Sequence, residues 1–275
     1  EPVFDEDSYG YRPGRSSHDA IAVTRKRCWN YDWVVEFDVK GLFDNIRHDF
    51  LMKALRKHCG LEWILLYVQR WLEAPLETED GVQTSRTCGT PQGGVVSPIL
   101  ANLFLHYAFD AWVRKALPGI PFCRYADDGL LHCVSEKQAK YAMNKLSERL
   151  KDCGLEVHPD KSKIVYCKDK NRSGDYSEIT FDFLGYEFRP RRCVTKRREC
   201  HPNFLPAIGR SSKKAINREI RSWHIQLKND KSLLDLSRMF NPKLRGWYIY
   251  YGRFYASALR TIWDNFNEYL VRWVR

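Results

Sequence analysis

Acidic residues stand at the ends of short apolar segments in two distant parts of the chain. Asp38 ends a β-branched run, while Asp127 and Asp128 lie between two apolar runs, 122–125 and 130–133. The Ala-Asp-Asp-Gly sequence between those runs is typical of a tight hairpin turn. Turn chemistry alone is therefore one explanation of the paired aspartates. A functional explanation depends on where Asp38 lies.

A sheet that places the Asp38 strand beside the predicted hairpin would bring the three carboxylates together. Their negative charges would repel one another unless a cation lay between them. Oxygen ligands suit Mg²⁺, and two such ions about 4 Å apart stabilise both the attacking and the leaving oxygen of a phosphoryl transfer. The pattern therefore favours a two-metal site over a purely structural turn.

The chain as a whole predicts mixed strands and helices up to about residue 190, and helices afterwards. Strands are expected near 34–39, 82–88, 122–133, 163–167 and 180–188, and helices near 47–58, 97–117, 136–153 and 259–274. A basic segment, 189–198, followed by Pro202 and Pro206, is expected to be a linker. In the helical part, Asn241 and Pro242 are predicted to begin a helix. An apolar stripe is expected to consist of Ile216, Ile220, Trp223 and Leu227.

Positive charge gathers in the last third of the chain. Residues 189–275 contain 20 Lys or Arg and 6 Asp or Glu, although the net charge of the whole chain is only +11. Phosphate neutralisation combined with ring stacking is typical of nucleic-acid binding, so RNA or a hybrid duplex is the expected partner. Some of the rings must instead form the core of this module. The rings in question are Trp223, Trp247, Tyr248, Tyr250, Tyr251, Phe254 and Tyr255.

No segment predicts a membrane span or secretion. The most apolar stretch, 95–113, is interrupted by polar residues, whereas a bilayer span needs about 20 mostly apolar ones. The first residues are acidic and contain no secretory signal pattern. Nine irregularly spaced cysteines favour reduced thiols. We therefore expect no membrane partner.

Several segments occur in an order that is specific to one family. The most distinctive are Pro-Gln-Gly-Gly at 91–94 and the tetrad Tyr-Ala-Asp-Asp at 125–128. With them the chain resembles the reverse transcriptases encoded by group II introns, also called maturases. Segments similar to the end of the fingers, the first palm motif, the primer grip and the maturase domain lie at 8–16, 37–46, 183–186 and 244–248.

The resemblance implies an α+β fold. A polymerase palm, in which helices pack on an antiparallel sheet, would be followed by an all-helical thumb or maturase domain. Residues 1–35 would be a residual fingers segment, 36–190 the reverse transcriptase palm, and 191–275 the thumb or maturase region, also called domain X. Earlier finger segments and later DNA-binding and nuclease segments of the family have no counterpart in this chain, so we expect a fragment.

The resemblance also implies the catalytic residues. The metal-binding groups would be Asp38, Asp127, Asp128 and the carbonyl of Val39, with two Mg²⁺ ions for which Mn²⁺ could substitute. Lys161 would lie near the leaving pyrophosphate and could donate a proton to it. Lys163 is close enough to be confused with it. An exposed lysine after a turn is the simpler alternative for Lys161.

The nucleotide site implied by the resemblance consists of Val39, Gly41, Leu42, Phe43 and Gln92. Backbone N–H groups of Gly41 and Leu42 would bind the triphosphate. Phe43 would lie beneath the sugar and exclude a 2′-hydroxyl group, with a core aromatic as the alternative.

The resemblance further implies a set of template and primer contacts. Arg12 and Arg15 could contact the template or merely brace the turn between them, and the two loop glycines could belong to an ordinary loop. The implied contacts are Arg12, Arg15, Gly93, Gly94, Leu184, Gly185 and Tyr186.

These features predict an RNA-directed DNA polymerase that also binds intron RNA to assist splicing and mobility. The alternative is a catalytically incomplete fragment that acts as an RNA-binding splicing module. An RNA-templated RNA polymerase would share the palm, but the ring of Phe43 argues against ribonucleotides. The expected partners are an RNA template, a primer, the intron RNA and deoxynucleoside triphosphates. A homodimer is left open, and the expected location is the cytoplasm, most simply that of a bacterium.

Overall fold

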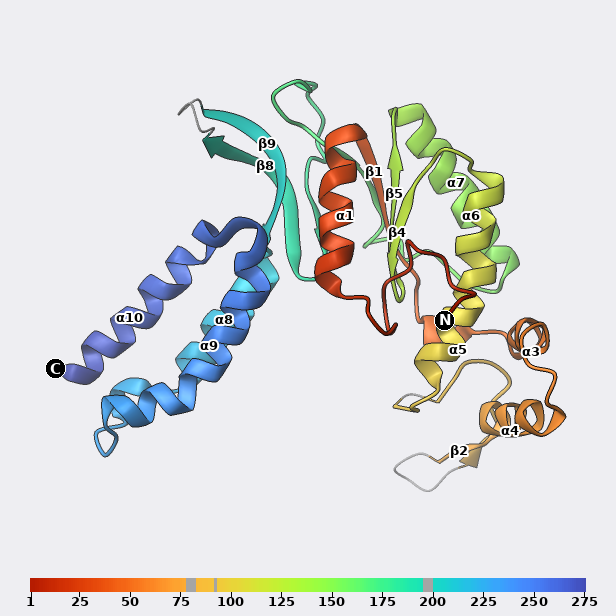
Figure 1. Cartoon of the computed structure of the whole chain (residues 1–275), viewed down its shortest axis with the longest axis horizontal. Helices are drawn as coiled ribbons and strands as arrows, with labels where there is room; N and C mark the ends of the chain where they lie inside the picture. The colour runs from red at the N-terminus through yellow and green to blue at the C-terminus, as the bar shows by residue number, and fades with distance from the viewer. Residues whose placement is uncertain (78–82, 92, 195–199) are drawn as a thin grey trace. The chain divides into compact units, whose positions relative to one another are not determined.

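The chain folds into two compact units, Glu1–Tyr166 and Cys167–Arg275 (Figure 1). The computed structural model describes residues 1–77, 83–91, 93–194 and 200–275. The division between the units differs from the boundary expected after residue 190. The reason is that the strands following residue 180 form a sheet of their own, which packs with the C-terminal helices.

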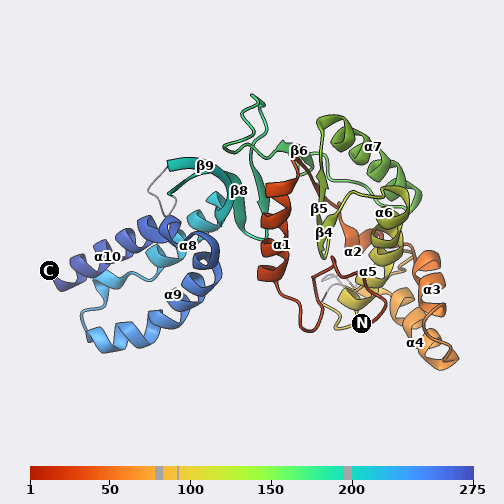
Figure 2. The same ribbon diagram turned by 45° about the horizontal axis from the view of Figure 1, so that its top comes forward.

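A four-stranded antiparallel sheet forms the centre of the first unit (Figure 2). Its strands lie in the order β4 Phe122–Tyr125, β5 Asp128–Cys133, β1 Trp33–Asp38 and β6 Lys163–Tyr166. The central strands β1 and β5 are buried along nearly their whole length, which explains their apolar and β-branched composition. The predicted hairpin and the predicted strand that ends at Asp38 are confirmed, and they are neighbours in the sheet.

Helices cover this sheet. α7 packs against β1 and β5, and α1 packs against β4. Ser16 and Ser135 cap α1 and α7, each by accepting a hydrogen bond from the backbone three residues further on. Of the described part of the strand expected over 82–88, Gln83–Thr84 (β3) pairs with β2 Leu76–Glu77, and Cys88 forms an isolated bridge with Arg47. The α-helices are α1 Ser17–Asn30, α2 Leu42–Asn45, α3 His48–Arg56, α4 Glu62–Glu73, α5 Ser97–Leu105, α6 Ala111–Ala116 and α7 Glu136–Asp152.

One π-helical turn interrupts the long helix predicted over 97–117. α5 leads into the π-helix η1, His106–Asp110, and the chain continues as α6. A π-helical turn changes the pairing of its carbonyl groups, which then need other donors. Arg149 of α7 supplies them, because its Nε and Nη2 donate to the carbonyls of Ala108 and Tyr107 at 3.0 Å each.

The second unit combines a three-stranded antiparallel sheet with helices. Strands β7 Phe181–Phe183, β8 Tyr186–Val194 and β9 Cys200–Ile208 lie in that order. The prediction that only helices follow residue 190 is wrong, since β9 pairs with β8 over its whole length. Within the described ranges, no helix has the length and apolar composition to cross a bilayer. The helices are α8 Arg210–Ser222, η2 Ile225–Leu227, α9 Leu233–Tyr255, η3 Ala256–Leu259 and α10 Arg260–Val274.

Two local predictions about these helices are wrong. Pro242 does not begin a helix but lies inside α9, whose first turn is capped by Ser232. Leu227 does not continue the apolar stripe of α8, because that helix ends at Ser222 and the Leu227 side chain is 71% exposed. The first three positions of the stripe are buried, as expected.

A buried guanidinium links the elements around the β4–β5 turn. Arg124 is 1% exposed and donates two hydrogen bonds of 2.7 Å to the carboxylate of Asp110. Its other three donors bind the Ser8 hydroxyl at 2.8 Å, the Asn102 side-chain oxygen at 3.1 Å and the Ala126 carbonyl at 3.0 Å. All five N–H groups of the guanidinium are therefore satisfied. One side chain thus joins the N-terminal segment, α5, the π-helical turn and the hairpin.

We expect Arg124→Met to destabilise the protein by about 3 to 5 kcal/mol, because the substitution leaves the Asp110 carboxylate buried without its cation. The double variant Arg124→Met/Asp110→Leu should recover much of this loss, since both charges are removed. Urea unfolding measures both effects. Lys140→Ala is the control, because it breaks an exposed pair with Glu136 and should cost less than about 1 kcal/mol. A loss for Arg124→Met as small as that of the control would contradict the role given to Arg124.

Candidate active site

The register of the sheet brings three carboxylates to one end of its central strands. Asp38 is the last residue of β1 and is paired with Asp128, the first residue of β5. Asp127 and Ala126 form the two-residue turn between β4 and β5. Ala126 has a φ of +57°, a conformation that favours glycine, so the turn that presents Asp127 is strained.

The N-terminal segment supports this strained turn. A Cβ atom at Gly10 would lie 2.4 Å from the backbone nitrogen of Ala126, so only glycine fits at this position. The Tyr9 N–H donates to the Arg124 carbonyl at 2.8 Å, and the Asn102 side chain donates to the Gly10 carbonyl at 2.8 Å. Gly10 belongs to the motif at 8–16, in which the sequence pattern assigns it no role of its own. The need for glycine at this position comes from the nearby backbone of Ala126, which is far away in the sequence, so the sequence alone could not predict it.

Burial and mutual repulsion act together on the aspartates. Burial raises the pKa of the Asp128 carboxyl to about 6, and the neighbouring charges of Asp127 and Asp38 contribute in the same direction. Burial also raises the pKa of Asp127, again with a contribution from Asp38. The site therefore holds negative charge at a cost that a cation would relieve.

Lys161 is the cation that contacts this group. Its Nζ lies 2.6 Å from Oδ2 of Asp38, and that hydrogen bond raises the pKa of the lysine. Lys163 instead faces Glu36, with 3.8 Å between Nζ and Oε2. Ser162, which no sequence pattern marks as functional, accepts a hydrogen bond of 3.3 Å from the Asp38 N–H. Of the two lysines that the sequence left in competition, Lys161 is the one that touches the carboxylates.

The donor chemistry of this group fits a hard divalent cation. All three side chains offer carboxylate oxygens, the ligands that Mg²⁺ prefers. Val39, whose carbonyl was predicted as a further ligand, follows Asp38 directly and is 3% exposed. Within the part of the chain that the structure describes, no three His, Cys, Asp or Glu side chains form a ready-made metal cluster. One Asp38 oxygen is paired with Lys161 instead.

The predicted nucleotide residues lie at a junction between two distant segments. Gly41 is the left-handed N-cap of α2, Leu42 is 2% exposed and therefore a core residue through its side chain, and Phe43 is half-buried. The Thr90 N–H donates to the Phe43 carbonyl at 2.6 Å. Gly89 was not singled out from the sequence, yet a Cβ atom there would lie 2.8 Å from the same carbonyl oxygen. The Phe43 segment and the loop before 91–94 are thus held together.

The loop of 91–94 is only partly described. Gln92, a predicted nucleotide contact, lies outside the described residues. Gly93 has a φ of +78° and open space where a Cβ would be, whereas a Cβ at Gly94 would lie 2.7 Å from the Ser97 hydroxyl. That hydroxyl donates to the Pro91 carbonyl at 2.7 Å. Gly94 is therefore required by a tight turn, and template contact by either glycine stays a prediction.

The two arginines of the N-terminal motif differ in surroundings. The side chain of Arg12 is 6% exposed, and its Nη1 donates to the carbonyls of Asp5 and Ser8 at 2.6 and 2.7 Å. It braces the segment that precedes Gly10 and not the turn at Pro13 and Gly14, and a template contact by Arg12 stays a prediction. Arg15 is exposed and lies 5.5 Å from the ring centroid of Tyr9. Arg15 is thus the better placed of the two for a template contact.

The predicted primer grip forms the β7–β8 turn of the second unit. Leu184 and Gly185 have φ values of +52° and +78°, as in a two-residue hairpin turn. Tyr250 donates from its hydroxyl to the Leu184 carbonyl at 2.9 Å, and Ser212 donates to the Gly185 carbonyl at 3.0 Å. The side chain of Tyr186 is fully buried and packs the turn against the helices. Leu184 and Gly185 are only half-buried, so of the three predicted residues they are the ones accessible to a primer.

The aromatic residues of the tail divide into core and surface. Trp223 is 8% exposed and stacks on Phe240 and Trp247 with centroid distances of 4.3 and 5.6 Å. Tyr251 also packs against this core, whereas Tyr248 is 55% exposed. Surface rings such as Tyr248, rather than Trp223, are the ones available for stacking on a nucleic acid.

Asp128→Asn should stabilise the cation-free protein at pH 7.5 by about 1 to 3 kcal/mol. The folded-state pKa of about 6 lies above that of an unfolded aspartate, so the stability contributed by this carboxyl is full in acid and is lost as the pH rises through 6. Urea unfolding at pH 4 and 7.5 should show a gain only at the higher pH. An equal effect at both values, or a gain matched by the exposed control Asp160→Asn, would contradict the electrostatic origin.

Two family models match most of the chain. A family model described as reverse transcriptase (RNA-dependent DNA polymerase) matches residues 2–188, and one described as the maturase-specific domain of group II introns matches residues 213–275. Telomerase from Candida albicans, solved with a fragment of telomeric RNA, superposes with a TM-score of 0.56 at 16% identity, over 98% of this chain and 48% of that one. The latter likeness supports the predicted α+β fold with a polymerase palm and a helical C-terminal part.

Relatives of known name are similar over most of the chain. The group II intron-encoded protein LtrA of Lactococcus lactis is 27% identical, over 99% of this chain and 57% of that protein. Protein YkfC of Escherichia coli is 28% identical, over 70% of this chain and 58% of that protein. The chain thus corresponds to less than two thirds of the length of either relative. It belongs to the reverse transcriptase family, in the branch that group II introns encode.

Proposed function

We propose that the chain catalyses RNA-directed DNA polymerisation, extending a primer on an RNA template with deoxynucleoside triphosphates. The observation that carries the proposal is the pairing of Asp38 with Asp128 on adjacent strands, with Asp127 in the connecting turn. All three aspartates lie within the match to the reverse transcriptase family. The raised pKa values of the turn aspartates indicate a site that gains from binding cations.

The protein's own groups have separate tasks in this reaction. Asp38, Asp127, Asp128 and the Val39 carbonyl would hold two Mg²⁺ ions, or Mn²⁺ in their place. When bound, such ions activate the primer 3′-hydroxyl group and neutralise the departing pyrophosphate. Lys161 keeps a proton on Nζ next to Asp38, from where it can be passed to the pyrophosphate. The strained turn at Ala126 fixes the direction of Asp127 before any substrate arrives.

Discrimination of the sugar would depend on the position of Phe43. Its backbone is held by Thr90, so the half-buried ring has a defined place at the junction. A cavity of about 460 Å³ borders this junction and is lined by Asp44, Arg86 and Gly89 among others. A ring fixed against a sugar would exclude a 2′-hydroxyl group, which supports deoxynucleotides as substrates.

We further propose that the second unit binds intron RNA and assists splicing and mobility. The match to the maturase-specific domain over residues 213–275 and the excess of basic residues in the tail support this role. The two roles are compatible within one chain. The same proposal locates the protein in the cytoplasm of a bacterium and includes a homodimer as its assembly.

Asp127→Asn should reduce primer extension on an RNA template by about 100-fold or more, the scale of losing one group that stabilises a transition state. The matched control is Asp160→Asn, which removes an exposed carboxylate from the same unit and should leave extension unchanged. Extension is measured by gel with Mg²⁺ and deoxynucleotides. Unchanged extension by Asp127→Asn would refute the assignment, whereas no extension by the unaltered chain would favour the RNA-binding role alone.

Phe43→Ala should raise the incorporation of ribonucleotides relative to deoxynucleotides by about 10- to 100-fold, because space opens for a 2′-hydroxyl group. Phe43→Tyr keeps the ring and should retain the selection. Single-nucleotide incorporation with each substrate gives the ratio. If the ratio is the same for both variants and the unaltered chain, Phe43 is a packing residue.

A further inference from the structure

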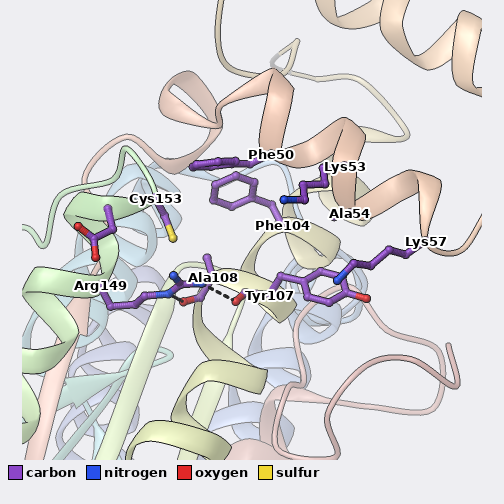
Figure 3. A pocket seen from close by; sticks show the side chains of 10 residues that line it. Phe50, Lys53, Ala54, Lys57, Phe104, Tyr107, Ala108, Arg149 and Cys153 are labelled. Atoms are coloured by element: carbon purple, nitrogen blue, oxygen red, sulfur yellow. Dashed lines mark hydrogen bonds between the residues drawn. The ribbon is translucent and has the colours of Figure 1, made fainter.

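A cavity of about 260 Å³ lies between α3, the π-helical turn and α7 of the first unit (Figure 3). None of the residues predicted from the sequence to act on nucleotide, primer or template is among those that line it. Its walls combine aromatic and charged side chains. The lining residues used below are Phe50, Lys53, Lys57, Tyr107, Arg149 and Asp152.

Cations converge on this cavity from two helices. Lys53 of α3 and Lys57, which directly follows the last residue of α3, stand one turn apart and reach over the cavity, while Arg149 enters from α7 (Figure 3). Asp152 is the one acidic side chain in the lining. Like charges at this spacing destabilise a helix slightly. A helix C-terminus favours basic residues by itself, and Arg149 also binds the carbonyls of Ala108 and Tyr107. What points to a ligand is therefore the pair of lysines together with the aromatic walls.

The aromatic wall is held in place before any ligand binds. Arg149 fixes the backbone of Tyr107 by donating to its carbonyl at 3.0 Å. His58 Nε2 lies 2.6 Å from the Tyr107 hydroxyl, and Lys57 Nζ lies 4.5 Å from the centroid of its ring. The π-helical turn is therefore used to present Tyr107 in a fixed orientation. A preorganised wall of this kind lowers the entropy cost of binding.

We propose that this pocket binds a nucleoside phosphate unit. The phosphate lies at Lys53 and Lys57, and the sugar and base lie against Phe50 and Tyr107. A simple inorganic anion would make no use of aromatic walls, and the volume is close to the lower end of the roughly 300–1,000 Å³ typical of small-ligand pockets. One nucleotide therefore matches the cavity in size and in chemistry. Its source is either an RNA strand that crosses the palm or a free nucleotide.

The RNA source rests on the proposed function, so the test separates the two. Binding of a fluorescent single-stranded RNA to the full chain is measured by anisotropy at several salt concentrations. Lys53→Ala/Lys57→Ala should weaken binding about 10-fold and reduce the salt slope by about 0.7, as expected when one phosphate is no longer neutralised. Tyr107→Leu should weaken binding with no change of slope, because it removes a ring and no charge.

Matched controls remove two lysines or arginines elsewhere. Lys137→Ala/Lys140→Ala on α7 lowers the charge of the same unit equally and should have little effect. Lys214→Ala/Arg218→Ala removes an exposed pair at the same helical spacing from α8 and should weaken RNA binding through the tail. A loss in the α8 variant with none in the Lys53/Lys57 variant would overturn the pocket while leaving the proposed function standing. No loss in either would overturn both.

Two further arms identify the source of the nucleotide. The first arm measures AMP binding by calorimetric titration. Binding that saturates in the unaltered chain and is lost in Lys53→Ala/Lys57→Ala indicates a free nucleotide. Photocrosslinking of a thiouridine-containing RNA to the Tyr107 peptide, lost in the same variant, indicates a strand. Both results support the pocket. Unchanged RNA and AMP binding, with loss of binding to a peptide of glutamate and phenylalanine, would make it a peptide site and refute the proposal.

Discussion

The buried ion pair between Arg124 and Asp110 is the interaction on which the first unit depends. A fully buried charge is tolerable only when every polar contact is made, and the five donors of Arg124 all find acceptors. Two of those acceptors, Ser8 and Ala126, belong to the N-terminal segment and to the turn that carries Asp127. The ion pair therefore holds together the parts of the site that come from distant segments. The same arginine stabilises the left-handed conformation of Ala126, because its guanidinium donates a hydrogen bond to the Ala126 carbonyl.

The sheet register imposes an electrostatic cost at the same place. The buried ring of Phe37 lies where a Cβ at Gly129 would be, only 2.1 Å from that position, so Phe37 must pair with a glycine. This pairing sets Asp38 opposite Asp128. Hydrophobic burial thus fixes three carboxylates at one edge, against their own repulsion. Lys161 offsets part of that repulsion from a loop, and its side chain is 63% exposed. An exposed lysine can move away from Asp38, as the proposed binding of metal ions there would require.

The sequence predicted those parts of the molecule that depend on local pattern. The hairpin at 122–133 and the strand ending at Asp38 were recognised because turn composition and apolar runs act over a few residues. The strand β9 was missed because Pro202 and Pro206 suggest a linker. Prolines are tolerated there, since β9 is an edge strand of its sheet. Pro242 likewise suggested a helix start, although it lies inside α9.

The contact between Lys161 and Asp38, and the steric roles of Gly10 and Gly89, could not be predicted from the sequence. Each depends on a partner far away along the chain.

The net charge of a segment does not show where basic side chains gather in this chain. Residues 1–188 hold 25 Lys or Arg against 28 Asp or Glu, which by itself argues against a polyanion as the partner of this part. The sum is misleading because the acids are not evenly distributed: three gather at the strand ends, and several others pair with arginines, as Asp5 and Asp7 do with Arg114. Cations that are free of such pairs can then converge locally, as Lys53 and Lys57 do over the cavity beside Tyr107. The position of each charge, set by helix spacing and by the π-helical turn, decides where an RNA strand can bind, and the total does not.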